Sequence, residues 1–181
     1  FNKENARLQS IKDKQNFGKK PTNRQKAIAR DRNNKVNDYM NKAARIIIDY
    51  CINNDIGVLV VGYNETFQRN SDIGRTNNQT FVNIPYGRLR EKLEYLCELN
   101  DIEFVKQEES YTSKASFWDK DVIPVYNNDN PKEYVFSGNR VHRGLYRTSD
   151  GYTFNADVNG ALNILRKSSV VDLLVLYSRG E

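Results

Sequence analysis

A short apolar run in the middle of the chain constrains its fold more than any other feature. Ile56 to Val61 reads Ile-Gly-Val-Leu-Val-Val, and such a continuous β-branched stretch is typical of a strand covered on both faces. A helix is predicted from Pro85 to about Asn100, because proline suits a first helical turn. A second strand is predicted from Ile102 to Gln107. Short links favour a right-handed strand–helix–strand unit with parallel strands. The ligand site of such an α/β fold lies beyond the carboxyl ends of its strands, where Glu109 stands.

Helices are predicted before and after the first strand in the sequence. We expect that strand to end at Gly62. A short polar helix from Asn5 to Gln15 comes first, and a break at Gly18 and Pro21 follows it. The long helix from Thr22 to about Asn54 has a predicted buried stripe of Val36, Tyr39, Met40, Ala43, Ile47, Tyr50 and Cys51. The stripe of the Pro85–Asn100 helix is Tyr86, Leu89, Leu93 and Leu96. The polar segment from Asn64 to Gln79 is expected to be a loop.

Positive charge gathers at the start of the long helix. The chain has 28 Lys and Arg against 23 Asp and Glu, a net charge of +5, which suits a polyanionic partner. The clustered cations are Lys19, Lys20, Arg24, Lys26, Arg30, Arg32 and Lys35. Few acids stand among them before Asp31, so we favour contact with nucleic-acid phosphates over a merely solvated helix face.

Cysteine and histidine are too scarce for a standard zinc site. Cys51 and Cys97 are the only cysteines, and His142 is the only histidine. Both cysteines lie in apolar helical surroundings, so we expect reduced packing residues and no disulfide. His142 is interpreted as a surface or packing residue. No apolar run approaches the roughly 20 residues that span a bilayer, and no membrane contact is expected.

The segment from Phe154 to Leu165 reads as the start of a helix with a carboxylate in its first turn. The predicted buried side is Val158, Leu162 and Leu165. Asp157 falls on a different side, next to the small residues Gly160 and Ala161, so its carboxylate can approach a sheet edge. Spacing alone leaves two roles open for Asp157, a cap of the helix or a metal ligand shared with another acid.

The run Asp157-Val158-Asn159-Gly160-Ala161-Leu162-Asn163-Ile164 resembles the last RuvC motif of TnpB proteins, the transposon-encoded relatives of type V CRISPR effectors. That motif opens with Asp-Arg-Asp, and its second Asp corresponds to Asp157, whereas Asn155-Ala156 replaces the first two residues. Tyr111-Thr112-Ser113 is a second match to the family. The resemblance runs from about Pro21 to Lys167 and rests on the order and spacing of these motifs.

The resemblance implies an α/β, RNase H-like (RuvC-type) nuclease domain over residues 21–167. A helical segment or linker would precede it over residues 1–20, and a tail would follow over 168–181. Within that tail the apolar stretch Val170 to Tyr177 fits a strand, a helix or the read-through of a truncated frame. The family also implies guide RNA and target DNA as partners and a cytoplasmic, nucleoid-associated location.

Three acids that hold Mg²⁺ (or Mn²⁺) carry out phosphodiester cleavage in this family, because hard cations stabilise both the attacking and the leaving oxygen. Asp157 would supply the acid of the final helix. No strand-like segment precedes Thr22, so we expect the first acid upstream of Phe1 and an inactive fragment when the chain is alone.

The middle acid departs from the family pattern. TnpB proteins carry a Glu at the end of the strand that corresponds to Val58–Asn64, where this chain has Val61 and Gly62. We predict that Glu109 replaces it, as in relatives such as Fanzor proteins that move the Glu to the neighbouring strand, because adjacent parallel strands lie only about 5 Å apart. Glu65 and the loss of this acid are the alternatives. Glu108 would face the other side of an extended strand.

The family's zinc ribbon is the second departure. Its two Cys-x-x-Cys pairs correspond to Ser116 with Asp119 and to Arg147 with Asp150. Because Ser and Arg are not zinc ligands, no structural zinc is expected. The segment 111–152 is predicted to be irregular and held by an aromatic cluster of Phe117, Trp118, Tyr126 and Tyr146.

Three arginines in this segment lie among aromatic residues. Arg140, Arg143 and Arg147 stand close to Tyr146, Tyr152 and Phe154. Aromatic rings stack on splayed bases while arginines neutralise phosphates, so these cations are candidate nucleic-acid contacts. A solvated loop with its own small core explains the same residues equally well.

Two other functions stay open. The missing Glu beside Gly62 and the lost zinc cysteines favour an RNA-guided repressor that no longer cuts, whereas Glu109 and Asp157 favour the nuclease. A RuvC-type resolvase is a third possibility, against which the long basic helix and the Tyr-Thr-Ser segment argue. The oligomeric state is not predicted.

Overall fold

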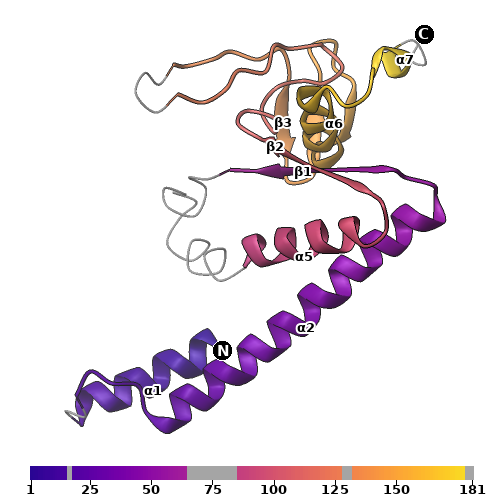
Figure 1. Ribbon diagram of the computed structural model, residues 1–181. Helices are drawn as coiled ribbons and strands as arrows, with labels where there is room; N and C mark the ends of the chain where they lie inside the picture. Colours follow the sequence, from indigo (N-terminus) through magenta and orange to yellow (C-terminus); the bar gives the residue numbers. More distant parts are fainter. Residues whose placement is uncertain (16–17, 65–84, 128–131, 178–181) are drawn as a thin grey trace. The chain divides into compact units, whose positions relative to one another are not determined.

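The computed structural model describes residues 1–15, 18–64, 85–127 and 132–177 (Figure 1). They form a mixed α/β structure with small sheets and divide into two compact units. Phe1–Asp55 and Tyr86–Leu96 make up the helical unit, and Ile56–Pro85 and Cys97–Glu181 make up the sheet unit. The domain boundaries after residues 20 and 167 stay predictions. Glu65 and most of the predicted loop from Asn64 to Gln79 lie outside the described residues.

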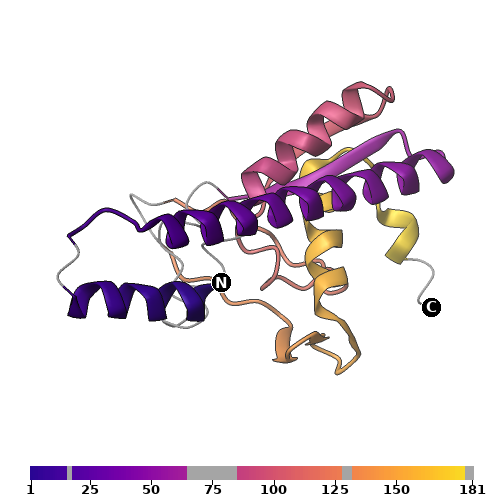
Figure 2. The same cartoon turned by 90° about the horizontal axis from the view of Figure 1, so that it is seen from below.

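The helical unit contains α1 (Asn2–Lys14), α2 (Asn23–Asn53) and most of α5 (Tyr86–Glu98). Helices α1 and α2 lie side by side (Figure 2). A capping box fixes the start of α2, because the Thr22 side chain accepts from the Gln25 N–H and the Gln25 side chain accepts from the Thr22 N–H. Lys12 in α1 is buried, and its ammonium donates to the carbonyls of Lys19 and Lys20, which precede α2. These bonds hold α1 to the start of α2.

The buried stripe of α2 differs from the predicted one. Met40, Ala44, Ile48 and Cys51 are buried, at spacings of four, four and three residues. Tyr39 is 68% exposed and Tyr50 is 63% exposed, so their predicted burial is wrong. Apolar residues occur on two sides of α2, and periodicity alone does not decide which side meets a partner. The prediction for α5 is wrong only at its start, because Leu93 is buried but Tyr86 is exposed. Both cysteines are buried and free, as predicted.

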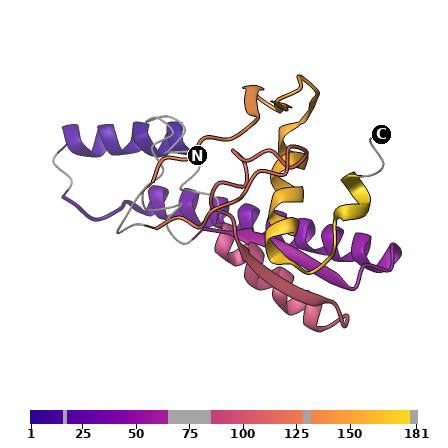
Figure 3. The ribbon, with the colours of Figure 1, turned by 90° about the horizontal axis from the view of Figure 1, so that it is seen from above.

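The sheet unit is built on the predicted parallel strand pair. Strand β1 (Val58–Tyr63) pairs with β2 (Glu103–Glu108), and Tyr63 lies opposite Glu108. Gly62 does not end the strand as predicted, because it pairs with Gln107 inside the ladder. Helix α6 (Ala156–Ser168) packs across both strands (Figure 3).

A second, antiparallel sheet occupies part of the segment that was expected to be irregular. It consists of β3 (Asn139–His142), β4 (Leu145–Arg147) and β5 (Thr153–Asn155) in the order β3-β4-β5. Strands of three or four residues are too short to show a periodic pattern, which is why the sequence did not reveal them. Of the alternatives for residues 170–177, the structure shows a helix, α7, over Leu174–Tyr177.

The buried side of α6 consists of amides rather than the predicted aliphatic residues. Ala156, Asn159 and Asn163 are buried, whereas Val158 is 49% exposed. The Asn159 amide donates to the Ala115 carbonyl at 2.8 Å and accepts from the Phe117 N–H at 3.0 Å. The Asn163 amide donates to the carbonyls of Thr112 and Ala115. The backbone groups of Thr112, Ala115 and Phe117 that face α6 need hydrogen-bond partners, and the two amides supply them where apolar side chains could not. These bonds join the Tyr-Thr-Ser segment to the Asp157 helix.

Candidate functional site

The Glu109 carboxylate lies over Gly62. Glu109 follows β2 directly, and its N–H donates to the Tyr63 carbonyl at 3.1 Å, which extends the strand pairing by one residue. A Cβ atom at position 62 would overlap the Glu109 carboxylate oxygen Oε2 and lie 2.8 Å from Ile164 Cδ1. Glycine in β1 therefore leaves the space that this carboxylate occupies.

Glu108 has a different partner. Its Oε2 atom accepts from Lys167 Nζ at 2.5 Å, and its Oε1 atom accepts from the Ser110 N–H at 2.6 Å. Burial raises the pKa of Glu108, but the hydrogen bonds from Lys167 and Ser110 outweigh burial and lower this pKa overall. Lys167 also donates to the carbonyls of Ser110 and Pro124. Glu108 thus anchors the end of β2 to α6.

Asp157 lies in the first turn of α6 without capping it. Asn155 is the cap, because its side-chain oxygen accepts from the N–H groups of Asp157 at 2.8 Å and Val158 at 3.1 Å. The capping role that spacing left open for Asp157 is therefore wrong, although its place in the first turn lets its charge complement the helix dipole. The Asp157 side chain is 85% exposed, and it accepts from Arg140 Nη2 at 3.2 Å. Its carboxylate is directed outward and is paired with a cation.

Glu109 lies next to the side of α6 that also carries Asp157. Ile164, which borders the space above Gly62, follows Asp157 by seven residues, or about 10 Å of helix axis, and seven residues bring a helix back to nearly the same side. Within the described ranges, no three or more His, Cys, Asp or Glu side chains gather closely enough to hold a metal ion. The described residues thus offer two acids, from a strand end and a helix start.

Hydrogen bonds join the two turns that correspond to the family's zinc-binding pairs. The Asp119 carboxylate accepts from the Ser149 N–H at 3.2 Å and from Ser149 Oγ at 2.6 Å, and the Asp119 N–H donates to Ser116 Oγ. Burial raises the pKa of Asp119, but the hydrogen bonds from Ser116 and Ser149 outweigh burial and lower it. We name this Asp119–Ser149 connection the clasp. That no zinc binds here stays a prediction.

Aromatic packing around the clasp differs from the predicted cluster. Phe117 stacks on Tyr177 with ring centroids 4.9 Å apart and meets Trp118 edge-on at 5.2 Å. Tyr146 is fully buried, and its hydroxyl donates to the Lys114 carbonyl. Burial and the charge of Asp121 raise the pKa of Tyr146 to about 12.

Tyr126 belongs to a separate group with Tyr111, Tyr134 and Phe136, which corrects its predicted place. Phe154 and Tyr177, which the sequence analysis missed, take its place beside Trp118.

The predicted cationic contacts are mostly exposed. Arg140, Arg143 and Arg147 are exposed in the sheet unit, and Arg140 contacts Asp157. His142, which was interpreted as a surface or packing residue, is also exposed. In the helical unit the exposed cations are Lys19, Lys20, Arg24, Lys26, Arg30 and Lys35. Arg32 is half-buried and lies 5.4 Å above the Phe1 ring. The exposed cations are therefore available to a polyanion.

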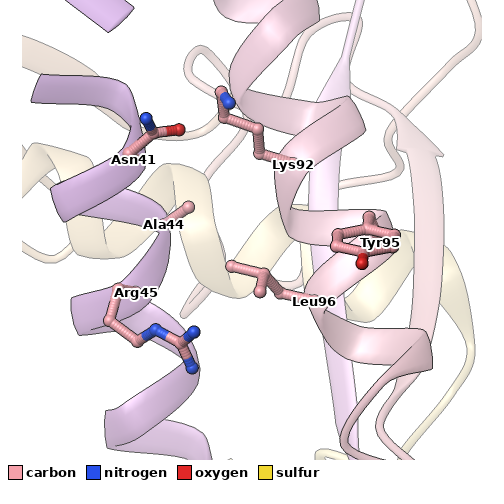
Figure 4. Close-up of a pocket in the computed structure, with 6 residues that line it drawn as sticks. All are labelled: Asn41, Ala44, Arg45, Lys92, Tyr95 and Leu96. Atoms are coloured by element: carbon pink, nitrogen blue, oxygen red, sulfur yellow. The ribbon is translucent and has the colours of Figure 1, made fainter. Parts of the chain in front are cut away.

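A cavity of about 290 Å³ separates α2 from α5 inside the helical unit (Figure 4). Asn41, Ala44 and Arg45 line it from α2, and Lys92, Tyr95 and Leu96 line it from α5. The small Ala44 side chain leaves room between the helices, and Arg45 and Lys92 add cations that the sequence analysis did not select. Their proximity depends on the packing of α2 against α5, which no local pattern reveals.

Two family models match most of the chain between them. Residues 1–68 match the model OrfB_IS605, described as a probable transposase, and residues 86–164 match the model Cas12f1-like, TNB domain. These matches agree with the resemblance that the motifs carried. The chain is therefore similar to the OrfB_IS605 and Cas12f1-like families over these two ranges. Its first match contains α1, α2 and β1, and its second contains Glu109, the clasp and Asp157.

Solved structures share the fold of this chain. A cryo-EM structure of a Cas12f1–sgRNA–target DNA complex superposes with a TM-score of 0.60 at 20% identity, over 94% of this chain and 41% of that chain. A CRISPR-Cas12f ternary complex gives a TM-score of 0.56 at 20% identity, over 95% of this chain and 33% of that chain. The chain thus spans less than half of the proteins it resembles in structure. No curated protein matches it.

Among the residues described by the structure, no helix is both long and apolar enough to cross a bilayer.

Proposed function

We propose that this chain forms the C-terminal, RuvC-like part of an RNA-guided DNA endonuclease, with an RNase H-like arrangement around β1, β2 and α6. In this proposal Glu109 and Asp157 bind Mg²⁺ (or Mn²⁺), and the first acid lies upstream of Phe1. The position of the Glu109 carboxylate over Gly62 carries the proposal. It brings an acid to the strand position where TnpB proteins have their middle Glu.

The donor chemistry of the two acids suits a hard cation. Carboxylate oxygens are the ligands that Mg²⁺ prefers, and Glu109 stands where the carboxyl ends of parallel strands favour a ligand site. A bound divalent cation would supply charge stabilisation for the attacking and leaving oxygens of the phosphodiester. Glycine at position 62 leaves room for Glu109. Asn155 caps α6, so capping does not occupy the Asp157 carboxylate, which contacts Arg140.

Arg140 would act beside the acids rather than as a metal ligand. Its guanidinium lies 3.2 Å from the Asp157 carboxylate, where it balances the charge of that acid. Arginine also binds phosphate through two parallel hydrogen bonds. In the proposed complex Arg140 would therefore hold the phosphate next to Asp157, and Arg143 and Arg147 would contact the backbone farther along the strand.

Guide RNA and target DNA are the proposed partners. One of the similar solved structures is a complex with an sgRNA and a target DNA, and this chain exposes basic side chains around the start of α2 that suit the same polymers. A cytoplasmic, nucleoid-associated location follows from these partners.

The proposal is tested by programmed DNA cleavage in the intact protein with its guide RNA. Glu109→Gln and Asp157→Asn each keep the side-chain size and remove the charge, so we expect at least a roughly 100-fold slower cleavage with unchanged complex formation. Glu103→Gln is the matched control, because Glu103 is an exposed glutamate on the same strand. Full cleavage by Glu109→Gln would exclude Glu109 as the middle acid.

A repressor that binds DNA without cutting is the second candidate. The Arg140–Asp157 pair favours it, because an acid neutralised by an arginine holds metal less readily. Guide-dependent DNA binding by the intact wild-type protein, with no cleavage in Mg²⁺ or Mn²⁺, would establish this candidate in place of the nuclease.

A further inference from the structure

A second cavity, of about 560 Å³, lies in the sheet unit beside the clasp. Its volume falls within the range of about 300–1,000 Å³ that is typical of small-molecule sites. Trp118, Lys120, Thr148, Asp150, Tyr152 and Tyr177 are among the residues that line it. Aromatic, acidic and cationic groups thus meet in one place, outside the proposed cleavage site.

One wall of this cavity is a rigid aromatic surface. Trp118 is half-buried, and it meets Phe117, Phe154 and Tyr177 at interplanar angles of 82°, 82° and 88°. Three nearly perpendicular neighbours fix the orientation of its ring, so little side-chain entropy is lost when a ligand binds. Tyr152 also lines the cavity and is 65% exposed, which leaves its ring available for stacking.

The polar side of the cavity offers hydrogen-bond acceptors. Asp150 Oδ1 accepts from the Thr148 hydroxyl and from the Tyr152 N–H, and these bonds orient the carboxylate. An ionised carboxylate accepts about four hydrogen bonds and donates none, so Asp150 has acceptor capacity left for a ligand. Asp119 is engaged by Ser149 in the clasp.

A cation stands at the same cavity. Lys120 Nζ lies 4.7 Å above the Tyr177 ring, and the side chain is exposed. An ammonium at this place attracts an anionic group of a ligand whose ring lies against the aromatic wall. A ring that carries an amino group and is joined to a phosphate would match the aromatic wall, the Asp150 acceptor and the Lys120 ammonium.

We propose that this cavity binds an unpaired nucleobase, which contacts Trp118 and Tyr152, donates its amino group to Asp150 and places its phosphate near Lys120. Cytosine and adenine present an amino donor, whereas thymine presents a carbonyl oxygen at the equivalent position. The site would therefore prefer cytosine and adenine to thymine. The inference shares with the proposed function only the nucleic-acid partner.

The clasp explains why such a cavity is available in this chain. A closed tetrahedral zinc site directs all four ligands at the metal and keeps no open position. Here the two turns are joined by the Asp119–Ser149 hydrogen bonds, and Asp150, at a position that corresponds to a family thiolate, lines the cavity instead.

Fluorescence tests this inference directly, because Trp118 is the only tryptophan of the chain. The complete 181-residue chain is titrated with the single-stranded pentanucleotides dC5, dA5 and dT5. We expect dC5 and dA5 to quench Trp118 emission and to bind at least fivefold more tightly than dT5. Deoxyribose 5-phosphate, which has no base, is expected to cause no change.

Two variants assign the contacts, with a matched control. Tyr152→Ala should weaken dC5 about tenfold, within the range that loss of one stacking ring causes, whereas Asp150→Asn should reduce the preference for dC5 over dT5 to below twofold. Tyr95→Ala removes an equally exposed tyrosine of the helical unit and should change neither value.

Several outcomes would overturn the inference. They are an unchanged emission with all three oligonucleotides, an equal response to deoxyribose 5-phosphate, and a preference that survives Asp150→Asn. Circular dichroism checks the fold of each variant, and the wild-type preference for dC5 decides the matter even when Tyr152→Ala does not fold. Glu109→Gln, which tests the proposed nuclease, should leave this titration unchanged, so the two proposals fail separately.

Discussion

The Gly62 position of β1 and the clasp depart from the TnpB pattern in opposite ways. At Gly62 the acid is missing from β1, but the neighbouring strand places the Glu109 carboxylate in the same space. At the clasp the thiolate positions have lost their chemistry, and hydrogen bonds from Ser149 to Asp119 connect the turns. One region has an acid from a neighbouring strand, whereas the other has a connection made by hydrogen bonds in place of thiolates.

The difference shows what each region requires. Only another acid replaces the negative oxygen ligand that a metal needs, and adjacent parallel strands are close enough for the exchange. A connection between two turns is less demanding, because any set of bonds that satisfies the backbone serves. Asn159 links the two regions, since α6 carries Ile164, which borders the space over Gly62, and the Asn159 amide binds the backbone of Ala115 and Phe117 next to the clasp.

The largest expected effect comes from cutting this link. Asn159→Ala leaves the Phe117 N–H and the Ala115 carbonyl without their Asn159 partner in a buried place, and we expect a loss of about 2–4 kcal/mol in the free energy of unfolding. Urea unfolding measures it. Asn139→Ala, at an exposed asparagine in β3, should change the same free energy by less than about 0.5 kcal/mol. Equal losses in the two variants would contradict a linking role for Asn159.

Filling the space over Gly62 should have the next largest effect. Gly62→Ala places a methyl group where the ends of the Glu109 and Ile164 side chains lie. Because both side-chain ends can shift, we expect a loss near the low end of overpacking, about 1–1.5 kcal/mol in the free energy of unfolding. Urea unfolding measures this loss as well. Gly57→Ala is the control, because a Cβ at Gly57 meets no atom within 4 Å.

A double substitution tests the exchange of acids itself. Gly62→Glu with Glu109→Ala returns the acid to β1 and removes the carboxylate that it would overlap. Under the nuclease proposal, this variant of the intact protein should cleave DNA at least tenfold faster than either single variant. Cleavage no faster than that of the single variants would sink the idea that the two positions are interchangeable.

Loss of the clasp should lower the free energy of unfolding by less. Ser149→Ala removes the hydroxyl that donates to Asp119 but keeps the backbone donor, so we expect a loss of about 1 kcal/mol in the free energy of unfolding. Ser10→Ala, at an exposed serine of α1, should be neutral. If both substitutions lie within experimental error of the wild type, the clasp does not hold the turns together.

The smallest expected effect is a pH dependence shared by the two regions. The pKa values of Glu108 and Asp119 are lowered in the folded chain. Groups with a lowered folded pKa stabilise the fold above their unfolded pKa values, and this contribution is lost as the pH falls through the folded values. Unfolding between about pH 6 and pH 3 should therefore show decreasing stability below about pH 4.5. Glu108→Gln should make that decrease shallower, whereas Glu103→Gln should not.

Local patterns were reliable where the contacts that cause them are local. The start of α2 was predicted from the break at Gly18 and Pro21, and the capping box within one turn explains it; β1 was predicted from its apolar run. The strands β3 to β5 were missed, because each is held by pairing with a neighbour rather than by its own pattern. The buried side of α2 was misjudged at Tyr39 and Tyr50, whose rings are as apolar as those of core residues.

By itself the sequence determined the longer helices, the parallel strand pair, the resemblance to TnpB proteins and the acids that merit testing. Tertiary structure alone decided that Glu109 fills the space over Gly62, that amides line the buried side of α6, and that Asp150 and Trp118 share a cavity. The physical reason is the separation in sequence between the residues that interact. Caps and periodicity arise between residues a few positions apart, whereas the Asn159–Phe117 bond spans 42 positions, and such a contact exists only after the chain has folded.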